Sequence, residues 1–582
     1  MVTMKLETKP VGKYGMVLDK DVEVPMRDGG KMVVNVYRPD APGRFPALTA
    51  CGPYGKDLHL KENFPATYAY IEKNQPQILA NSTGKYLQHE MPDIECFVRE
   101  GYVIVRGDVR GTSKTPGLQD PNSPLEYRDG YDVVEWAAAQ PWCTGKVGMV
   151  GISYHAVGQW VVAGQRPPHL ACILPWHGTA EYYDGRTRQG GIFCDGFTRG
   201  WWERQRINQY GSPDCPYKDM FTGERNTGPV TLSKEELEAN RAAYVDTILA
   251  HPLMDEWYRE RMPRYEDVEV PAFVVANWNG LGLHGRGTIE AFTRIGSPNK
   301  WLKVESGNYF TTAMLPESIA LALRFFDRYL KDMDNGWEKE PRVEVSVRGA
   351  DDKVNRWLPG NDWPLPETHW TAWHLDLAAK GFAPGPVAHA ARIDFDSTGE
   401  GVAFRSAPLD KPLTFAGPIK LKLWVSASTP DMDLFVTLRA YAPDGREVPF
   451  LSSMEPKSPV SQGWLRVSHR KTDPKRSTAW LPVQTHDEEQ LLQPGEVVSV
   501  EIPVWPASLA LPAGYQLELL VSGKDFERPV DPHAPKGATR GSGLYTHKDP
   551  VDRPAARSNG TYTIHAGEGR DAHLLLPVIN NA

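Results

Sequence analysis

The sequence predicts an α/β part with a mostly parallel sheet covered by helices on both faces, followed by an all-β sandwich. Two observations carry this prediction. Apolar strand patterns alternate with helical patterns from residue 45 to about residue 175, and the alternation resumes at Pro271. Such alternation is typical of a parallel sheet. After Gly336, short strands with turn residues between them recur and helical patterns are almost absent, which is typical of a sandwich.

The elements of the α/β part follow one another in a simple order. A turn signal, Arg27-Asp28-Gly29-Gly30, separates two short strands within 22–37. Further strands are expected at 45–50, 102–106, 147–150, 170–174, 271–276 and 301–305, and helices at 95–100, 127–139, 287–295 and 316–331.

Two stretches interrupt this pattern. Residues 63–90 are polar and irregular, and we interpret them as an insertion near the site. The stretch 176–268 is rich in Trp, Tyr, Arg and Gly, and we interpret it as a cap over the sheet. A helix is expected there at 233–250, because its Ser-x-x-Glu start forms a capping box.

These patterns divide the chain into four consecutive segments. They are a first core part (1–175), the cap (176–268), a second core part (269–336) and the β-sandwich (337–582). The strands expected in the sandwich lie at 343–347, 419–426, 435–440, 497–502 and 516–521.

Composition excludes several classes of partner. The net charge is -8 and the pI is near 6.1, which argues against nucleic-acid and anionic-membrane partners. The first residues form no apolar leader, and no apolar run is long enough to cross a bilayer. The six cysteines show no Cys-x-x-Cys spacing, so we expect free thiols, no metal and a cytoplasmic protein. We expect a small-molecule substrate, no organic cofactor and a possible homo-oligomer.

The chain is organised around the stretch from Val147 to Trp160. An apolar strand leads into Gly151-Ile152-Ser153, and a segment with helical spacing follows. A strand that turns sharply into a helix through Gly-x-Ser is a nucleophile elbow, which exposes the serine oxygen at a helix N-terminus. His155 stands where the full motif has its second glycine. The alternative is an ordinary N-cap serine after a strand.

Other segments carry a resemblance to a known family. Asp108-Val-Arg-Gly-Thr, Gly151-Ile-Ser-Tyr, Gly417-Pro-Ile-Lys-Leu and Pro430-Asp-Met-Asp-Leu-Phe occur in the order found in the cocaine-esterase-like (CocE/NonD) hydrolases. These resemble the X-prolyl dipeptidyl peptidases and the α-amino-acid ester hydrolases. The resemblance implies an α/β-hydrolase core with an inserted helical cap and a C-terminal jelly-roll domain that closes one wall of the site.

The resemblance also implies part of the catalytic machinery. Ser153 matches the family nucleophile, and the backbone N–H of Tyr154 matches one oxyanion donor. Tyr54, within Pro53-Tyr54-Gly55-Lys56-Asp57, matches the tyrosine whose hydroxyl is the second donor. Such a donor is worth about 3 kcal/mol of transition-state stabilisation.

The acid and the base of the family triad do not carry over. The family aspartate falls on Gly280 or Gly282, depending on which neighbouring residues anchor the match, and there is no Asp or Glu from Val270 to Ile289. The family histidine falls on Tyr309. A serine hydroxyl is a weak nucleophile without a positioned base, so another group must replace these two residues if Ser153 is to react.

Three interpretations follow. In the first, Ser153 is a nucleophile with a relocated base, and His284 is the best candidate because it follows the strand that normally supplies the acid. His155 and His177 are weaker candidates, and either Asp108 or Asp184 would orient the ring. The predicted function is then hydrolysis of an ester or amide of a small, apolar or aromatic substrate.

In the second interpretation, the fold serves a lyase, cyclase or isomerase. Ser153, Tyr54 and Tyr309 would then hydrogen-bond a polarised carbonyl, with Tyr309 as an acid or base. In the third, the chain binds a ligand without catalysis. For all three, the expected substrate-binding residues are Asn279, His155, His177, Trp201, Trp202 and Tyr210.

Overall fold

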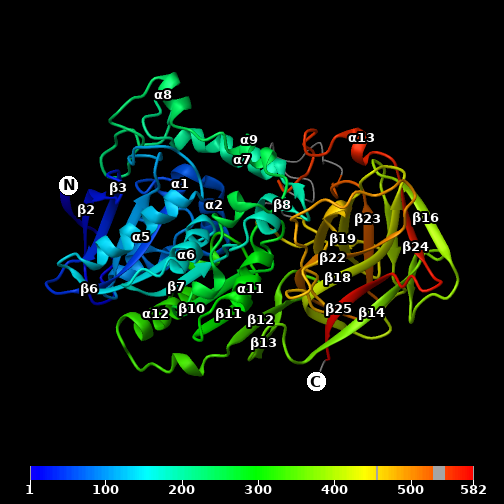
Figure 1. Ribbon diagram of the computed structural model, residues 1–582. Coiled ribbons are helices and arrows are strands. Elements are labelled where there is room, and N and C mark those ends of the chain that lie inside the picture. Colours follow the sequence, from blue (N-terminus) through cyan, green and yellow to red (C-terminus); the bar gives the residue numbers. More distant parts are fainter. Residues whose placement is uncertain (1, 454–456, 529–543, 581–582) are drawn as a thin grey trace.

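The computed structural model describes residues 2–453, 457–528 and 544–580, and its first half is built on one large mixed sheet (Figure 1). Among the described residues this sheet has eleven strands in the order β1-β2-β3-β5-β4-β6-β7-β10-β11-β12-β13. The strands from β5 to β12 run parallel to one another, and antiparallel strands flank them at both ends. Their bounds are β1 Val2–Leu6, β2 Met16–Pro25, β3 Lys31–Pro39, β4 Phe45–Gly52, β5 Val103–Asp108, β6 Cys143–Ile152, β7 Leu170–Trp176, β10 Ala272–Asn277, β11 Lys300–Glu305, β12 Val343–Arg348 and β13 Val354–Gly360.

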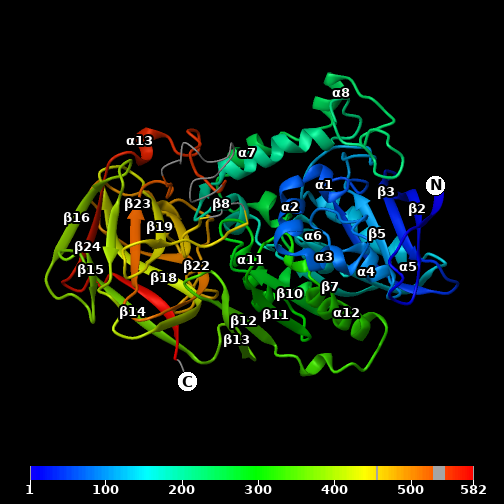
Figure 2. The ribbon, with the colours of Figure 1, turned by 180° about the vertical axis from the view of Figure 1, so that it is seen from behind.

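Both faces of this sheet are buried, as the parallel strands predict. Along β10, Val274 belongs to one apolar cluster, whereas Phe273 and Val275 belong to another. The first cluster includes residues of α5 (Pro124–Ala138), α6 (Tyr154–Gly164) and α11 (Gly285–Arg294). The second includes residues of α4 (Ile94–Val98) and α12 (Pro316–Leu330) (Figure 2). The carboxyl ends of the parallel strands are therefore held rigidly from both sides.

Two excursions from the sheet surround the carboxyl ends of its strands. The stretch expected to be irregular (63–90) contains two short helices, α2 (Pro65–Asn74) and α3 (Pro76–Asn81), and α1 (Leu60–Asn63) ends where it begins. Both α2 and α3 begin with proline, whose fixed φ suits the first helical turn. The second excursion crosses the top of Figure 1. It contains η1 Tyr183–Thr187, β8 Arg188–Gln189, β9 Ile192–Phe193, α7 Asp195–Arg204, η2 Gln205–Asn208, α8 Lys234–Ala239, α9 Tyr244–Ala250, α10 Glu256–Arg259 and η3 Tyr265–Asp267.

The prediction of a single helix at 233–250 is wrong, because the chain forms α8 and α9 with a break between them. The capping box at Ser233 and Glu236 is present. No residue of α8 is buried, so nothing extends that helix by packing. At Arg241 the chain instead pairs with Gln119 in a short bridge.

The C-terminal half is an all-β domain built on a twelve-stranded, almost entirely antiparallel sheet among the described residues. One large apolar cluster fills its interior. The remaining elements are η4 Thr312–Met314, η5 Trp337–Lys339, β14 Thr368–Asp376, β15 Gly381–Ala383, β16 Ala391–Asp396, β17 Val402–Arg405, β18 Leu413–Ala427, β19 Asp433–Tyr441, β20 Glu447–Val448, β21 Ser461–Arg466, η6 Val467–His469, β22 Val498–Leu511, β23 Gln516–Ser522, α13 Ala555–Ser558, β24 Thr561–Ala566 and β25 His573–Ile579.

One predicted strand belongs to a different sheet from the one expected. The strand at 343–347, assigned from its alternation to the sandwich, is β12, and it pairs in parallel with β11. It extends the first sheet and also contacts the second domain, since Ser508 Oγ donates to the backbone carbonyl of Ser346 at 2.8 Å. The longest helices of the described residues, α5 and α12, have 15 residues each, fewer than the about 20 that a bilayer span needs, and no described helix is a membrane-span candidate.

Candidate active site

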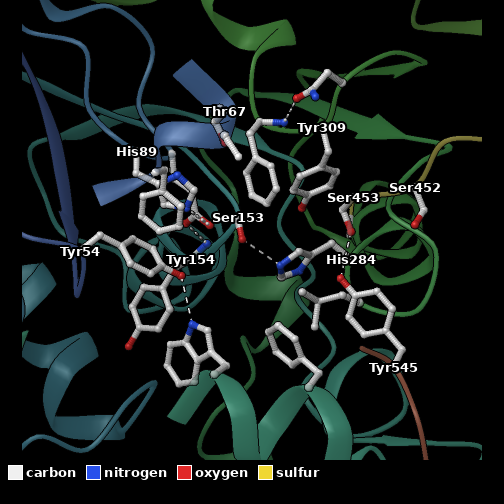
Figure 3. A pocket seen from close by; sticks show the side chains of 18 of the residues that line it. Tyr54, Thr67, His89, Ser153, Tyr154, His284, Tyr309, Ser452, Ser453 and Tyr545 are labelled. Carbon is white, nitrogen blue, oxygen red and sulfur yellow. Dashed lines mark hydrogen bonds and ion pairs between the residues drawn. The ribbon is translucent and has the colours of Figure 1, made fainter. Parts of the chain in front are cut away.

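A cavity of about 400 Å³ lies where the carboxyl ends of the parallel strands meet the two excursions and the C-terminal domain (Figure 3). Loops that follow β4, β6, β10 and β11 contribute Tyr54, Ser153, His284 and Tyr309 to its wall. The cavity is lined by Tyr54, Phe64, Ala66, Thr67, Tyr70, His89, Glu90, Ser153, Tyr154, Arg186, Phe197, Trp201, Arg204, Leu283, His284, Asn308, Tyr309, Phe310, Leu451, Ser452, Ser453 and Tyr545. Its wall is mostly apolar, with a few polar groups near Ser153, which is the usual character of a small-molecule site.

Ser153 occupies a strained turn between β6 and α6. Its φ of 54° and ψ of -113° are rare for a residue with a side chain, and strain of this kind is concentrated at functional sites. His155, in place of the motif glycine, is accommodated by glycines around it. A Cβ on Gly52 would lie 2.4 Å from His155 Nε2, and a Cβ on Gly151 would lie 2.4 Å from His155 Cβ. The elbow therefore keeps its shape without the second glycine of the motif.

His284 brings an imidazole to the nucleophile. It lies in the turn between β10 and α11, and its Nε2 is 3.0 Å from Ser153 Oγ (Figure 3). This is hydrogen-bond distance, so the sheet places together two residues that are 131 positions apart in the sequence. A serine paired with an imidazole is the arrangement that nucleophilic catalysis requires.

The other ring nitrogen of His284 has an unusual partner. The backbone N–H of Thr179 donates to His284 Nδ1 at 3.2 Å. A neutral imidazole carries one proton, and this contact assigns it to Nε2, which donates toward Ser153. Burial, and then the charge of Arg186, lower the pKa of His284 to about 3. The ring is therefore neutral, and its favoured tautomer cannot accept the serine proton.

Neither aspartate proposed to orient a histidine reaches His284. Asp108 Oδ1 accepts the backbone N–H of Lys56 at 2.7 Å. Asp184 accepts from Arg286 Nη1 at 2.6 Å and from the backbone N–H of Gly190 at 2.6 Å. Both carboxylates serve other contacts, and a backbone N–H stands where a triad has its acid.

The backbone N–H of Tyr154, expected to be an oxyanion donor, is already bonded. It donates to Oε2 of the buried Glu90 at 3.0 Å. His89 Nε2 lies 3.5 Å from the same carboxylate, and His155 Nδ1 lies 3.8 Å from it. Burial raises the pKa of Glu90, but the facing His155 and His89 rings outweigh burial and hold the pKa well below its usual range. A negative charge thus lies against the backbone N–H that the sequence predicted to be an oxyanion donor.

Tyr54 keeps a proton available for the cavity. Trp201 Nε1 donates to the Tyr54 hydroxyl oxygen at 3.2 Å (Figure 3). The tyrosine oxygen is the acceptor in this contact, so its own hydrogen is free to donate elsewhere. Burial raises the pKa of Tyr54 above its usual value, which keeps the hydroxyl protonated.

Comparison with known proteins agrees with this architecture. The family model of the X-Pro dipeptidyl-peptidase (S15 family) matches residues 28–309, and that of the X-Pro dipeptidyl-peptidase C-terminal non-catalytic domain matches 335–575. The chain is 23% identical to the cocaine esterase of a Rhodococcus species, over 98% of this chain and 99% of that one. The structure of a CocE/NonD family hydrolase from Staphylococcus aureus is 30% identical, with a TM-score of 0.82 over 97% of this chain and 94% of that chain. The chain belongs to the CocE/NonD hydrolase family.

Membership places the chain among serine hydrolases of the esterase and peptidase type. An α-amino-acid ester hydrolase shares the fold, with a TM-score of 0.68, 16% identity and coverage of 97% of this chain and 96% of that chain. The C-terminal domain is termed non-catalytic in the family, yet here Leu451, Ser452, Ser453 and Tyr545 from this half of the chain line the cavity. The domain therefore closes one wall of the cavity in this CocE/NonD hydrolase, as the resemblance implied.

Tyr309, which the sequence comparison matched to the family histidine, lies beside His284 in the cavity wall. Its ring stacks on His284, with centroids 6.1 Å apart and planes 12° apart. Its hydroxyl donates to the backbone carbonyl of His177. Burial raises its pKa well above the usual value. The hydroxyl proton of Tyr309 is therefore used in the bond to His177, and the protonated phenol is a poor base.

Two histidines expected in the site lie behind the cavity wall. His177 places Nδ1 3.0 Å from the backbone oxygen of Tyr309 and Nε2 3.0 Å from Glu305 Oε1. It therefore supports the loop that carries Tyr309. His155 is buried against Gly52 and faces Glu90. Neither histidine is among the cavity-lining residues, so their expected contact with substrate is not supported by the geometry.

Of the other expected substrate-binding residues, Trp201 lines the cavity and three do not. Asn279 Nδ2 donates to a backbone carbonyl at 2.7 Å. The ring of Trp202 lies 3.7 Å from the guanidinium carbon of Arg241. Tyr210 is half-buried, and its backbone N–H donates to Gly111 at 2.9 Å. The geometry therefore does not support contact of Asn279, Trp202 or Tyr210 with a substrate in this cavity.

Sequence reasoning missed three groups around Ser153. Glu90 and Arg186 lie on the two excursions, where no motif marks them. Thr179 acts through its backbone, so its side chain gives no signal. A sequence clue existed for the insertion, since the polar and irregular stretch 63–90 was interpreted as lying near the site.

The described residues that line the cavity form no group with metal-ligand spacing. Among the described residues, one group of side chains has metal-ligand spacing, formed by His374, Asp571 and His573. It lies on the C-terminal sheet and not in the cavity. Asp571 already contacts both histidines, at 2.6 and 2.9 Å, which accounts for the cluster without an ion.

Proposed function

We propose that this chain hydrolyses an ester or amide of a small, apolar or aromatic acid through Ser153. The observation that carries the proposal is the 3.0 Å contact between Ser153 Oγ and His284 Nε2 on the floor of a mostly apolar cavity. Ser153 would attack the carbonyl carbon while its proton passes to His284 Nε2, and Tyr54 would donate to the developing oxyanion. His284 would then return the proton to the leaving group, and water would release the acid.

The tautomer of His284 makes the proposed reaction slow. Before it accepts a proton at Nε2, the ring must carry its hydrogen at Nδ1, which opposes the N–H of Thr179. A catalytic histidine held in the wrong tautomer loses about 10⁴ in kcat. Activity is therefore most readily measured with esters whose activated leaving groups depart without being protonated.

A non-hydrolytic reaction is the second candidate, and the same contact favours it. With its proton on Nε2, His284 donates to Ser153, and the serine hydroxyl is free to donate to a substrate carbonyl. The adjacent Glu90 is then an ionised carboxylate in reach of the cavity. Polarisation of a carbonyl beside a carboxylate is suited to proton abstraction, as in a lyase or isomerase.

Turnover of p-nitrophenyl esters by the wild-type protein and by Ser153→Ala separates the two candidates. Acyl hydrolysis predicts that release of p-nitrophenol falls to background in Ser153→Ala. Turnover that survives this substitution contradicts the proposal and favours the second candidate.

A further inference from the structure

Arg186 is a buried cation on the cavity wall whose charge has no carboxylate partner. It belongs to η1, the π-helical turn Tyr183–Thr187 that follows β7, and it is 4% exposed. π-Helical turns are frequent at functional sites. One guanidinium nitrogen donates to Asn122 Oδ1, and no carboxylate of the described residues lies within 4.0 Å of the group.

Other buried arginines have carboxylates or several other oxygens of the protein as partners. Arg188 and Arg286 form ion pairs with carboxylates at 2.5 and 2.6 Å. Arg106 and Arg241 lack a close carboxylate, but each directs its N–H groups at two or more protein oxygens. Neither of them lines the cavity. Arg186 differs from all four, because it combines a single protein acceptor with a place on the cavity wall.

Aromatic rings hold the guanidinium in place. Its carbon lies 5.1 Å from the ring centroid of Tyr182, 5.5 Å from that of Trp201 and 6.0 Å from that of Tyr154. Such stacking orients the planar group. It does not neutralise the charge, and burial of an unpaired charge is costly.

The acids nearby do not supply the missing charge. Glu126 accepts from the Tyr154 hydroxyl, and burial raises the pKa of Glu126 to about 8, so it is mostly neutral at neutral pH. Glu90 is the one acid among the described lining residues, and it is bound by the Tyr154 N–H. The described lining therefore carries Arg186 and Arg204 against one carboxylate that already has its own donors.

We propose that the cavity takes a substrate that bears a carboxylate, and that Arg186 binds this group. A guanidinium binds a carboxylate through two parallel hydrogen bonds, which fixes the orientation of the substrate as well as adding affinity. The apolar wall then holds the body of the substrate, and its ester or amide carbonyl lies at Ser153. This substrate class rests on the proposed acyl hydrolysis, although anion binding by Arg186 is measurable without it.

Two matched esters test the preference. They are the p-nitrophenyl ester of 4-carboxybenzoic acid and its methyl ester, which differ in charge but little in shape. We expect wild-type kcat/KM to favour the charged ester by about tenfold or more, and Arg186→Gln to lower kcat/KM for the charged ester about tenfold more than for the neutral ester. Arg186→Lys should retain part of the preference. Arg128→Gln, on the exposed side of α5, is the control for removal of a positive charge and should keep the full preference.

Equal loss for both esters in Arg186→Gln, or no preference in the wild-type protein, overturns the inference. If Arg186→Gln does not fold, the wild-type preference and Arg186→Lys decide.

Calorimetry separates this inference from the proposed function. Benzoate, with benzamide as its neutral control, is titrated into Ser153→Ala and into Ser153→Ala/Arg186→Gln. Benzoate binding that requires Arg186, together with no ester turnover in the wild-type protein, supports the anion site and contradicts acyl hydrolysis. Turnover of neutral esters without Arg186-dependent binding of benzoate supports hydrolysis and contradicts the anion site.

Discussion

The carboxylate of Glu90 accepts the backbone N–H of Tyr154 at 3.0 Å, at the position where a CocE/NonD hydrolase would be expected to bind its oxyanion. Two negative charges at one place repel each other, so an anionic tetrahedral intermediate has to displace this side chain. The contact therefore predicts that Glu90 slows the proposed hydrolysis at Ser153.

Removal of Glu90 should therefore increase ester hydrolysis. Glu90→Ala frees the Tyr154 N–H, and we expect kcat/KM for a neutral p-nitrophenyl ester to rise about tenfold or more, since one oxyanion donor is worth about 10²–10³ in kcat. Glu90→Gln removes the charge but keeps an acceptor, and should give a smaller increase. A fall in activity in both variants would instead identify Glu90 as a group that acts on the substrate.

The kcat/KM for hydrolysis should not fall in the pH range in which a free histidine becomes protonated. The pKa of His284 is lowered to about 3, so the proton leaves at a lower pH than from a free histidine and the ring is already neutral in weak acid. We expect kcat/KM to be flat between about pH 5 and pH 8. An acid limb with an inflection near 6.5, measured with a neutral ester, would contradict this expectation, because it would show that His284 titrates like a free histidine.

Loss of the Tyr54 hydroxyl should slow the chemical step and leave binding nearly unchanged. In Tyr54→Phe the free donor beside Ser153 is gone, and we expect kcat to fall by about 10²–10³ with little change in KM. Tyr68→Phe, in α2 of the neighbouring insertion and outside the cavity lining, is the control. A rise in KM with constant kcat would mean that Tyr54 only binds the substrate.

A buried ion-pair cluster should determine how firmly the cap is held to the C-terminal domain. Asp552 pairs with Arg188 of the cap at 2.5 Å and with Arg466 of β21 at 3.0 Å. Asp552→Ala leaves two buried guanidinium groups without this partner, and we expect it to lower the free energy of unfolding by about 3–5 kcal/mol. Thermal unfolding measures this, with the exposed Asp444→Ala as the control. Equal melting temperatures for the two variants would contradict the role given to the cluster.

The sequence predicted the fold well because its main signals are periodic. Strands such as β10 and helices such as α12 carry their pattern within a few residues, and the elbow at Ser153 is a local motif. Tyr54 was found through the family resemblance, and His284 through its place after a strand. In contrast, β12 was assigned to the wrong sheet, because alternation reveals that a strand exists and not which strand it joins.

The electrostatic character of the site was not predictable in the same way. The bond from the Tyr154 N–H to Glu90 joins residues 64 positions apart, and the N–H of Thr179 reaches a ring 105 positions away. The residue types do not reveal which backbone N–H groups donate to the site. Such contacts depend on how the insertion and the cap pack against the sheet, and no motif in either segment specifies that packing.

The rate at which a fluorophosphonate labels Ser153, followed by mass spectrometry in the wild-type protein and in His284→Ala, tests the central claim most directly. The account predicts a single adduct on Ser153 that forms at least about 10² times more slowly without His284. No adduct on Ser153, or equal labelling rates in the two proteins, would contradict the claim that His284 activates Ser153 for acyl transfer.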